Sequence, residues 1–335
     1  MTQATPSKVL ITGGAPAGGL ASFAQSLALG FMALGIPAEV ISPGKIAGRY
    51  GELRDPAILK ILSTTAVFAA PLARRAICVA HGFPRADVQG WIKMLGIIAS
   101  YRIANRCAQL VAVSHYAAAH LRAIFSLHVD AVIHNPLHTL FRDPIDAPAP
   151  PRQYVTFAGR LHPAKRLDRI FPAICSLVEE TPDLHACILG AGPLRAELEA
   201  QAQGNSRIEF TGSLPPDQVR AWLRRTRLFV SGCETEALGI AYLEALSQGC
   251  VVAMPAAGGG LEIAPEEIGK SIRLLPLPLE LAAVLSVLRE ALAGTACPLP
   301  LAGYEASAVA ARYLELDGRR RPDPCLAALS TARHG

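Results

Sequence analysis

The sequence predicts an α/β protein built from two Rossmann-like domains in tandem. Its 335 residues indicate about two domains, at roughly 150 residues per domain. Short apolar runs alternate with helical patterns, a rhythm typical of parallel sheets covered by helices. The rhythm is interrupted over residues 143–152, which contain four prolines, and then restarts. We therefore place an N-terminal domain over residues 1–145 and a C-terminal domain over residues 152–300.

The elements of the N-terminal domain are read from apolar runs bounded by glycine and proline. A helix over residues 20–34 ends at Gly35 and Pro37. A second helix, over residues 88–102, has an apolar body with basic residues, so it either packs on the core or touches a membrane. The predicted strands are 8–12, 38–42, 76–80, 109–114 and 131–133.

The C-terminal domain repeats the same alternation after the proline-rich segment. Because strands and helices follow one another directly, the sheet is expected to be parallel. The predicted strands are 154–158, 186–189, 208–210, 228–231 and 251–254. The predicted helices are 166–179, 194–203, 216–226 and 239–248.

Composition excludes several classes of protein. With 51% hydrophobic and 18% charged residues, the chain is too apolar to be disordered. A net charge of +5 is small for a nucleic-acid binder, so no nucleic-acid partner is expected. Residues 1–150 hold 13 Lys and Arg against 7 Asp and Glu, a net +6, which leaves −1 for the remainder. The basic half favours an anionic partner, either a phosphorylated acceptor or an acidic membrane surface.

Sequence features also bear on the compartment. The longest apolar run, residues 61–73, is shorter than the roughly 20 residues that a membrane span needs. The start of the chain does not have the pattern of a signal peptide, and the eight cysteines include no CxxC pair. We expect reduced, buried thiols and a cytoplasmic protein, with peripheral contact to the inner face of a membrane left open.

Two candidate site elements follow strands of the N-terminal domain. Gly18 and Gly19 belong to a glycine-rich strand-to-helix turn, whose N–H groups favour a phosphate or another anion. His81 follows the strand 76–80, at the edge where open parallel sheets bind ligands. It either hydrogen-bonds a ligand hydroxyl or developing charge, or is satisfied by nearby backbone as a structural histidine.

The glycine-rich turn also resembles the opening of the short-chain dehydrogenase/epimerase proteins, which need a tyrosine followed four residues later by a lysine. None of the seven tyrosines has a lysine at that spacing. The hydride-transfer interpretation therefore fails.

The C-terminal domain carries the stronger candidates. Arg160 and Lys165 lie on one short loop, and two such cations can converge on a diphosphate unless both are only exposed surface residues. Glu236 and Glu244 are eight residues apart, about 12 Å if helical, which suits opposite ends of one long ligand better than an acid–base pair. The N–H groups around Gly239 and Ile240, at a helix start, would face a phosphate between them.

These residues bear a resemblance to a known family. Residues 159–165, 189–198, 210–212 and 236–244 resemble, in order and spacing, the GR-x4-K, G-x-GP, FxG and E-x7-E elements of glycosyltransferase family 4. The resemblance covers nearly the whole chain and implies the GT-B fold, in which two Rossmann-like domains face each other across a cleft. It also implies that a closing helix, about 304–317, packs back on the N-terminal domain.

The resemblance implies a retaining enzyme that moves a hexose from a nucleotide-diphosphate sugar to a glycan or lipid-linked acceptor. The expected setting is bacterial cell-surface polysaccharide or glycolipid synthesis. Arg160 and Lys165 would hold the donor diphosphate and neutralise the leaving group. Glu236 would contact the donor sugar, and His81 would face the sugar ring.

The remaining site residues would bind the donor nucleotide. Glu244 would contact its ribose, and backbone at Leu238, Gly239, Ile240, Gly18 and Gly19 would line the rest of the donor. Because no Asp-x-Asp pair occurs, no catalytic metal is expected, and the only cofactor-like molecule is the donor itself.

The chain departs from the family pattern at two places in these motifs. Arg166 follows the lysine where the family has glycine, and Ala237-Leu238 stands in place of Gly-Phe. Two alternatives stay open: another GT-B enzyme, such as a nucleotide-sugar epimerase or a phosphorylase, and an inactive GT-B scaffold protein.

Overall fold

The computed structural model describes residues 4–13, 19–142, 150–295 and 297–318. The chain forms two compact units. Unit 1 runs to His138 and takes up the chain again from Gly303, and unit 2 comprises Thr139–Ala302. The division falls at His138 instead of in the proline-rich segment, whose residues 143–149 lie outside the described ones. Phe141 belongs to unit 2 because its carbonyl accepts a buried hydrogen bond from Gln248 Nε2 at 2.8 Å.

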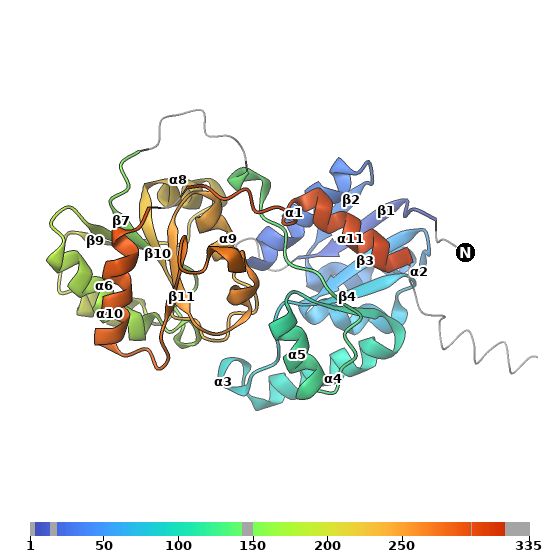
Figure 1. The fold of residues 1–335 in the computed structure, drawn as a ribbon. Helices are drawn as coiled ribbons and strands as arrows, with labels where there is room; N and C mark the ends of the chain where they lie inside the picture. Colours follow the sequence, from blue (N-terminus) through green and yellow to red (C-terminus); the bar gives the residue numbers. More distant parts are fainter. Residues whose placement is uncertain (1–3, 14–18, 143–149, 296, 319–335) are drawn as a thin grey trace, which may run out of the picture. The chain divides into compact units, whose positions relative to one another are not determined.

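In the described part of unit 1, six parallel strands form a sheet in the order β2-β1-β3-β4-β5-β6 (Figure 1). The strands are β1 (Lys8–Thr12), β2 (Ala38–Ile41), β3 (Ile58–Ser63), β4 (Ala76–Ala80), β5 (Gln109–Ala112) and β6 (Ala131–Val132). The helices are α1 (Gly19–Ala33), α2 (Tyr50–Arg54), α3 (Ala86–Gln89), α4 (Trp91–Cys107), α5 (His115–Ala123) and α11 (Ala306–Gly318). Three short 3-10 segments outside this list matter below: η1 (Pro43–Arg49) and η2 (Thr64–Leu72) in unit 1, and η3 (Thr139–Phe141) in unit 2.

The strand β3 was not predicted from the sequence. It lies in the middle of the sheet, all six of its residues are buried, and one of them is Lys60. A strand buried on both faces shows no alternation, and a lysine argues against burial. Here the ammonium group is satisfied by backbone carbonyls, among them those of Ile58 and Arg74, each at 2.8 Å.

The predicted helix 88–102 is two helices. The chain turns at Gly90, which has a φ of +78° and separates α3 from α4. Helix α4 then continues to Cys107 and packs against the 3-10 segment η2. None of the described helices is long and apolar enough to cross a membrane.

Helix α11 returns to unit 1, where it packs on α1. The contact is close at Gly30, because a Cβ there would lie 2.0 Å from the carbonyl oxygen of Ala306. Asp317 forms a buried ion pair with Arg75 at 2.7 Å, and Gln109 Nε2 donates to the Leu316 carbonyl at 3.1 Å. The last described segment of the chain is thereby part of the first unit.

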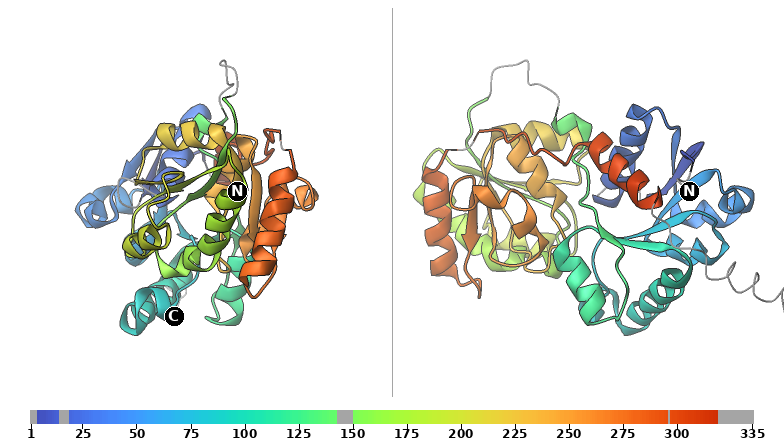
Figure 2. Two further views of the ribbon diagram at one scale, coloured as in Figure 1. Left: turned by 90° about the vertical axis from the view of Figure 1, so that its left-hand side faces the viewer. Right: turned by 45° about the vertical axis from the view of Figure 1, so that its right-hand side comes forward.

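Within the residues described for unit 2, six parallel strands follow the order β12-β11-β10-β7-β8-β9. The strands are β7 (Tyr154–Ala158), β8 (His185–Leu189), β9 (Ile208–Gly212), β10 (Thr226–Val230), β11 (Val251–Pro255) and β12 (Ile272–Leu275). The helices are α6 (Leu167–Glu180), α7 (Arg195–Gln201), α8 (Pro216–Arg225), α9 (Ile240–Ser247) and α10 (Leu281–Ala293). The strand β12 and the helix α10 were not predicted. Rotated views show helices on either side of each sheet (Figure 2).

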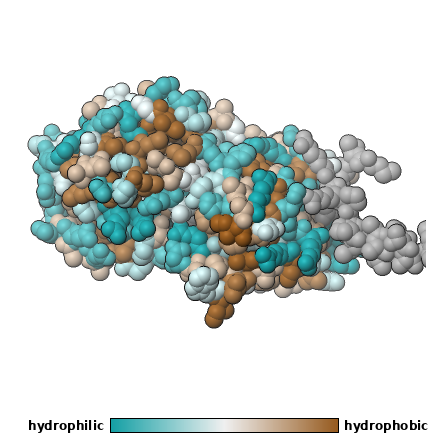
Figure 3. Space-filling view, turned by 60° about the horizontal axis from the view of Figure 1, so that its bottom comes forward, coloured by the Kyte–Doolittle hydropathy of each residue, from teal (hydrophilic) through white to brown (hydrophobic). Residues whose placement is uncertain are grey.

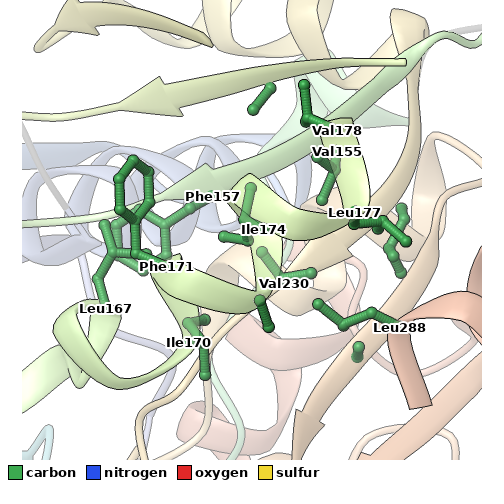
Figure 4. Packing of buried hydrophobic residues seen from close by; sticks show 14 of the residues in the cluster. Val155, Phe157, Leu167, Ile170, Phe171, Ile174, Leu177, Val178, Val230 and Leu288 are labelled. Atoms are coloured by element: carbon green, nitrogen blue, oxygen red, sulfur yellow. The ribbon is translucent and has the colours of Figure 1, made fainter. Parts of the chain in front are cut away.

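The core of unit 2 lies where α6 and α10 cover the sheet. Phe171, Ile174 and Leu177 of α6 point toward Val155 of β7 and Leu288 of α10 (Figure 4). The side chains of α6 that face this core are fully buried. This packing holds β7 and β10 rigidly, and the loops that leave their carboxyl ends carry the candidate site.

Candidate functional site

Two loops of unit 2 bring together the residues singled out by the sequence. Arg160 and Lys165 lie on the loop after β7, and Glu236 lies on the loop after β10. Because β7 and β10 are neighbouring parallel strands, both loops leave the same edge of the sheet. The two loops meet at Lys165, whose Nζ lies 2.5 Å from Glu236 Oε2. The prediction that these charges converge is therefore met for this pair.

Further contacts tie the two loops together. Cys233 Sγ donates to the Ala164 carbonyl at 3.3 Å, and Arg166 Nε lies 3.7 Å from Glu234 Oε1. The loops also touch through their backbones, since a Cβ on Gly232 would lie 2.6 Å from the Arg166 carbonyl oxygen. On its other side, the Glu236 carbonyl accepts from Gly259 N at 2.8 Å. The Lys165–Glu236 pair is therefore held by structure on both sides.

The glycines after β8 hold the Arg160 loop from the opposite direction. Gly159 N donates to the Leu189 carbonyl and Leu161 N donates to the Ala191 carbonyl, each at 2.9 Å. A Cβ on Gly190 would lie 1.8 Å from the Gly159 oxygen, so only glycine permits this approach. The G-x-GP element therefore acts through backbone packing and fixes the chain on both sides of Arg160.

The electrostatics keep this site cationic. Burial works to lower the pKa of Lys165, but the Glu236 carboxylate more than offsets it, so the pKa is raised and the ammonium stays charged. Arg160 is exposed, and its side chain forms no ion pair with any described residue. A guanidinium without a protein partner beside a fixed ammonium is suited to bind an anion.

Helix α9 starts at the same edge of the sheet. Its N-cap, Gly239, has a φ of +92°, and a Cβ there would lie 2.4 Å from the ring of Tyr242. The Tyr242 hydroxyl hydrogen-bonds Ser231 Oγ at 2.9 Å, which anchors the first turn. Leu238 is buried, so it can reach a ligand only through its backbone. The N-terminus at Ile240 adds the positive end of a helix dipole.

Glu244 lies further along α9 and has no described partner for its carboxyl group. Burial raises the pKa of Glu244 to about 8, because the charged form loses solvation. An unpaired buried carboxyl group costs free energy that hydrogen bonds to a ligand would recover. Its environment differs from that of Glu236, which is paired with Lys165.

His81 and Gly19 belong to unit 1. His81 follows β4 directly, and no described group hydrogen-bonds its buried Nε2. Burial lowers the pKa of His81 to about 4, against the opposing effect of the Asn135 side chain, so the imidazole is neutral near pH 7. A neutral ring can exchange hydrogen bonds with a hydroxyl but does not bring a positive charge. Gly19 is the first residue of α1, and Gly18 lies outside the described residues.

Sequence reasoning missed several supporting residues, of which Arg166 is the clearest. It adopts a left-handed conformation, with a φ of +53°, at the N-cap of α6. Left-handed backbone favours glycine, which is the residue that the resembling family carries there. The departure from the motif was the available signal, and the structure shows that the arginine keeps the glycine-like backbone.

Comparison with known families matches this unit. A family model described as "Glycosyl transferases group 1" matches residues 152–288. That range contains Arg160, Lys165, Glu236 and Glu244. Unit 2 carries a group 1 glycosyltransferase domain.

Curated relatives of this domain are glycosyltransferases. The chain is 31% identical over 118 residues to the sulfoquinovosyl transferase SQD2 of Arabidopsis thaliana, covering 35% of this chain and 22% of that protein. It is 32% identical over 156 residues to a phosphatidylinositol N-acetylglucosaminyltransferase subunit of Homo sapiens, covering 44% and 31%. The matches thus span less than a third of either relative.

Solved structures resemble the whole chain. HepE of Anabaena, solved with UDP and glucose, has a TM-score of 0.67 at 16% identity and covers 96% of this chain and 99% of its own. WaaG, a glycosyltransferase involved in lipopolysaccharide biosynthesis, has a TM-score of 0.64 at 15% identity and covers 93% and 94%. The sucrose-phosphate synthase of Thermosynechococcus elongatus has 0.66 at 15%, covering 99% and 98%. The chain has the GT-B fold.

Proposed function

We propose that this protein is a retaining glycosyltransferase that moves a hexose from a nucleotide-diphosphate sugar to a glycan or lipid-linked acceptor. The observation that carries the proposal is the Lys165–Glu236 pair beside the unpaired Arg160 and the N-terminus of α9. A cationic site of this kind suits a leaving group that bears two phosphates. The similarity to HepE, solved with UDP and glucose, supports a nucleotide donor.

The proposed reaction breaks the bond between the donor's anomeric carbon and the diphosphate oxygen, which leaves with the electron pair. The acceptor hydroxyl oxygen bonds to that carbon on the same face, and its proton passes to a phosphate oxygen of the donor. Arg160 and Lys165 stabilise the negative charge that grows on the diphosphate. Glu236 holds Lys165 in place and contacts the donor sugar, while Glu244 accepts hydrogen bonds from the ribose.

The acceptor class is supported by the curated relatives. Phosphatidylinositol N-acetylglucosaminyltransferase is named for a lipid acceptor, which favours a lipid-linked acceptor and glycolipid synthesis here. A cytoplasmic location, a bacterial cell-surface role and a reaction without metal also remain predictions. Full activity after EDTA treatment and gel filtration would support the last of these.

A donor screen tests the proposal. Thermal shift with UDP-, GDP- and ADP-sugars should find one donor that raises the melting temperature of the wild-type chain. With that donor, Lys165→Ala and Glu236→Ala should lower turnover by about 100-fold or more, because each removes part of the diphosphate site. Lys270→Ala, which removes an exposed lysine of the same unit, is the matched control and should leave turnover unchanged.

Product analysis separates the proposal from its alternatives. A glycosyltransferase yields a nucleoside diphosphate and a glycosylated alcohol. An epimerase or phosphorylase would instead yield a product that contains no acceptor alcohol. Near-normal transfer by Lys165→Ala, or a wild-type chain that no nucleotide sugar stabilises, would contradict the assignment, and the second result would favour the scaffold alternative.

A further inference from the structure

Exposed apolar side chains concentrate on helix α4 of unit 1. Trp91 is 70% exposed, Ile92 is 90% exposed and Leu95 is 60% exposed. All three lie in the first turns of the helix, just after the bend at Gly90. Figure 3, in which the base of Figure 1 comes forward, shows apolar side chains gathered on a projection at the lower edge of the view. Large side chains of this kind in water are unfavourable unless another surface covers them.

The exposed residues follow the period of the helix. Ile92, Leu95, Ala99 and Ile103 are spaced by three or four positions and all face solvent. The opposite face of α4 carries Tyr101 and Ala104, which are buried in the core of unit 1. Helix α4 is therefore apolar on both sides, yet only one side is covered. A surface helix normally has a polar outer face, so this one is built for contact.

Charge indicates what covers the outer face, which we call the α4 face and define as Trp91, Ile92, Leu95, Ala99 and Ile103. Helix α4 contains no acidic residue. It carries the exposed cations Lys93, Arg102 and Arg106, and none of them forms an ion pair within the described residues.

The acidic residue nearest to α4 in the sequence, Asp87, is already paired with Arg85. An apolar stripe flanked by unpaired cations complements a surface that is apolar inside and anionic outside.

We propose that the α4 face docks unit 1 on an anionic lipid bilayer. The helix lies in the plane of the interface, with Ile92 and Leu95 among the acyl chains and Lys93, Arg102 and Arg106 at the headgroups. A tryptophan at the start of the helix fits this depth, because indole rings favour the boundary between water and hydrocarbon. With 17 residues, about 25 Å of helix, α4 lies on the membrane and does not cross it. The inference rests on unit 1 alone and requires no donor.

Vesicle binding of the intact chain tests the docking. We expect the wild type to bind vesicles of phosphatidylcholine that contain about one third phosphatidylglycerol, and to bind pure phosphatidylcholine at least about tenfold more weakly. Binding should weaken further at about 0.5 M NaCl, because salt screens the headgroup charge. Equal binding to both vesicle types would overturn the electrostatic part of the proposal and with it the assigned occupant.

Variants locate the surface. Ile92→Ser combined with Leu95→Ser should weaken binding at least about tenfold, whereas Ile124→Ser, at a residue 61% exposed elsewhere in unit 1, should not. Arg102→Gln combined with Arg106→Gln should also weaken binding. Arg169→Gln combined with Lys270→Gln, which removes the same charge from exposed positions of unit 2, should leave binding unchanged. Unaltered melting temperatures show that the variants fold.

Two outcomes would overturn the proposal. The first is wild-type affinity in the Ile92/Leu95 variant. The second is a wild-type dimer in light scattering that this variant dissociates, together with no vesicle binding, since a second copy of the chain would then cover the face. Donor-induced stabilisation of unit 2 is measured separately on the same variants, so failure of docking and failure of the proposed function are distinguishable.

Discussion

Two glutamates of one short motif have opposite environments. Glu236 is paired with Lys165, whereas Glu244 is buried without a described partner and has a pKa of about 8 in place of the usual 4.5. The spacing of the motif locates both residues but does not reveal this difference. Burial and pairing depend on which loops meet, and that is a property of the folded unit. The structure thus supports distinct roles for two residues that look equivalent in the sequence.

The raised pKa of Glu244 predicts a pH-dependent stability. Between about pH 4.5 and 8 the folded chain holds this proton while the unfolded chain releases it, so the stability falls as pH rises through this window. Glu244→Gln removes the titrating group. The variant's melting temperature relative to wild type should therefore rise from pH 5 to pH 9, by an amount that corresponds to about 1–3 kcal/mol.

The control for this prediction is Glu290→Gln, because the side chain of Glu290 is 73% exposed. Its melting temperature relative to wild type should not change with pH. A flat difference for Glu244→Gln over the same range would show that this carboxyl group titrates normally.

At the scale of elements, glycines decide how closely neighbouring segments approach. Gly190 and Gly232 let backbone segments touch in unit 2, and Gly30 lets α1 touch the start of α11 in unit 1. The first two lie in or beside motifs, so a special role could be suspected from the sequence. Gly30 stands inside a helical pattern, where glycine costs stability and gives no sign of what it contacts. Only the packing of α11 explains it.

Two helical glycines give a matched test of this explanation. Gly30→Ala should destabilise the protein by about 1–3 kcal/mol, because the new methyl group would overlap the Ala306 carbonyl. Gly96→Ala on α4, where a Cβ meets nothing within 4 Å, should instead raise stability by up to about 1 kcal/mol. Chemical denaturation of both variants measures the difference, and equal effects would refute a packing role for Gly30.

At the scale of the whole molecule, unit 1 is closed by the far end of the chain. Arg75 and Asp317 are 242 positions apart in the sequence, yet their side chains form a buried pair at 2.7 Å. Arg75 also donates to the carbonyl of Ala4 at 2.6 Å, so one side chain joins three distant segments. Unit 1 is therefore incomplete until α11 has been synthesised.

Removing one partner of this pair should affect unit 1 alone. Asp317→Ala leaves a buried guanidinium without its carboxylate, which costs about 3–5 kcal/mol. Hydrogen–deuterium exchange on the intact protein should speed up in α1 and β4 but not in α6 and α10. Glu315→Ala, which removes an exposed carboxylate from the same helix, should change neither region. Faster exchange throughout unit 2 would contradict the assignment of α11 to the first unit.

The sequence by itself determined the fold class, most of the strands, the loops that carry Arg160, Lys165 and Glu236, and the family of unit 2. These features depend on local patterns: apolar runs, glycine turns, and charged residues at strand ends. The sequence did not predict β3, β12 or α10, and it did not decide which face of α4 is open.

Only the tertiary structure decided those points, because each depends on neighbours that are distant along the chain. Lys60 can be buried in β3 because the Arg74 carbonyl, among others, accepts from its ammonium group. Arg166 can take a backbone suited to glycine because the adjoining loop admits it at Gly232. Residue types show what chemistry is available, but burial, pairing and exposure are fixed only when remote segments meet.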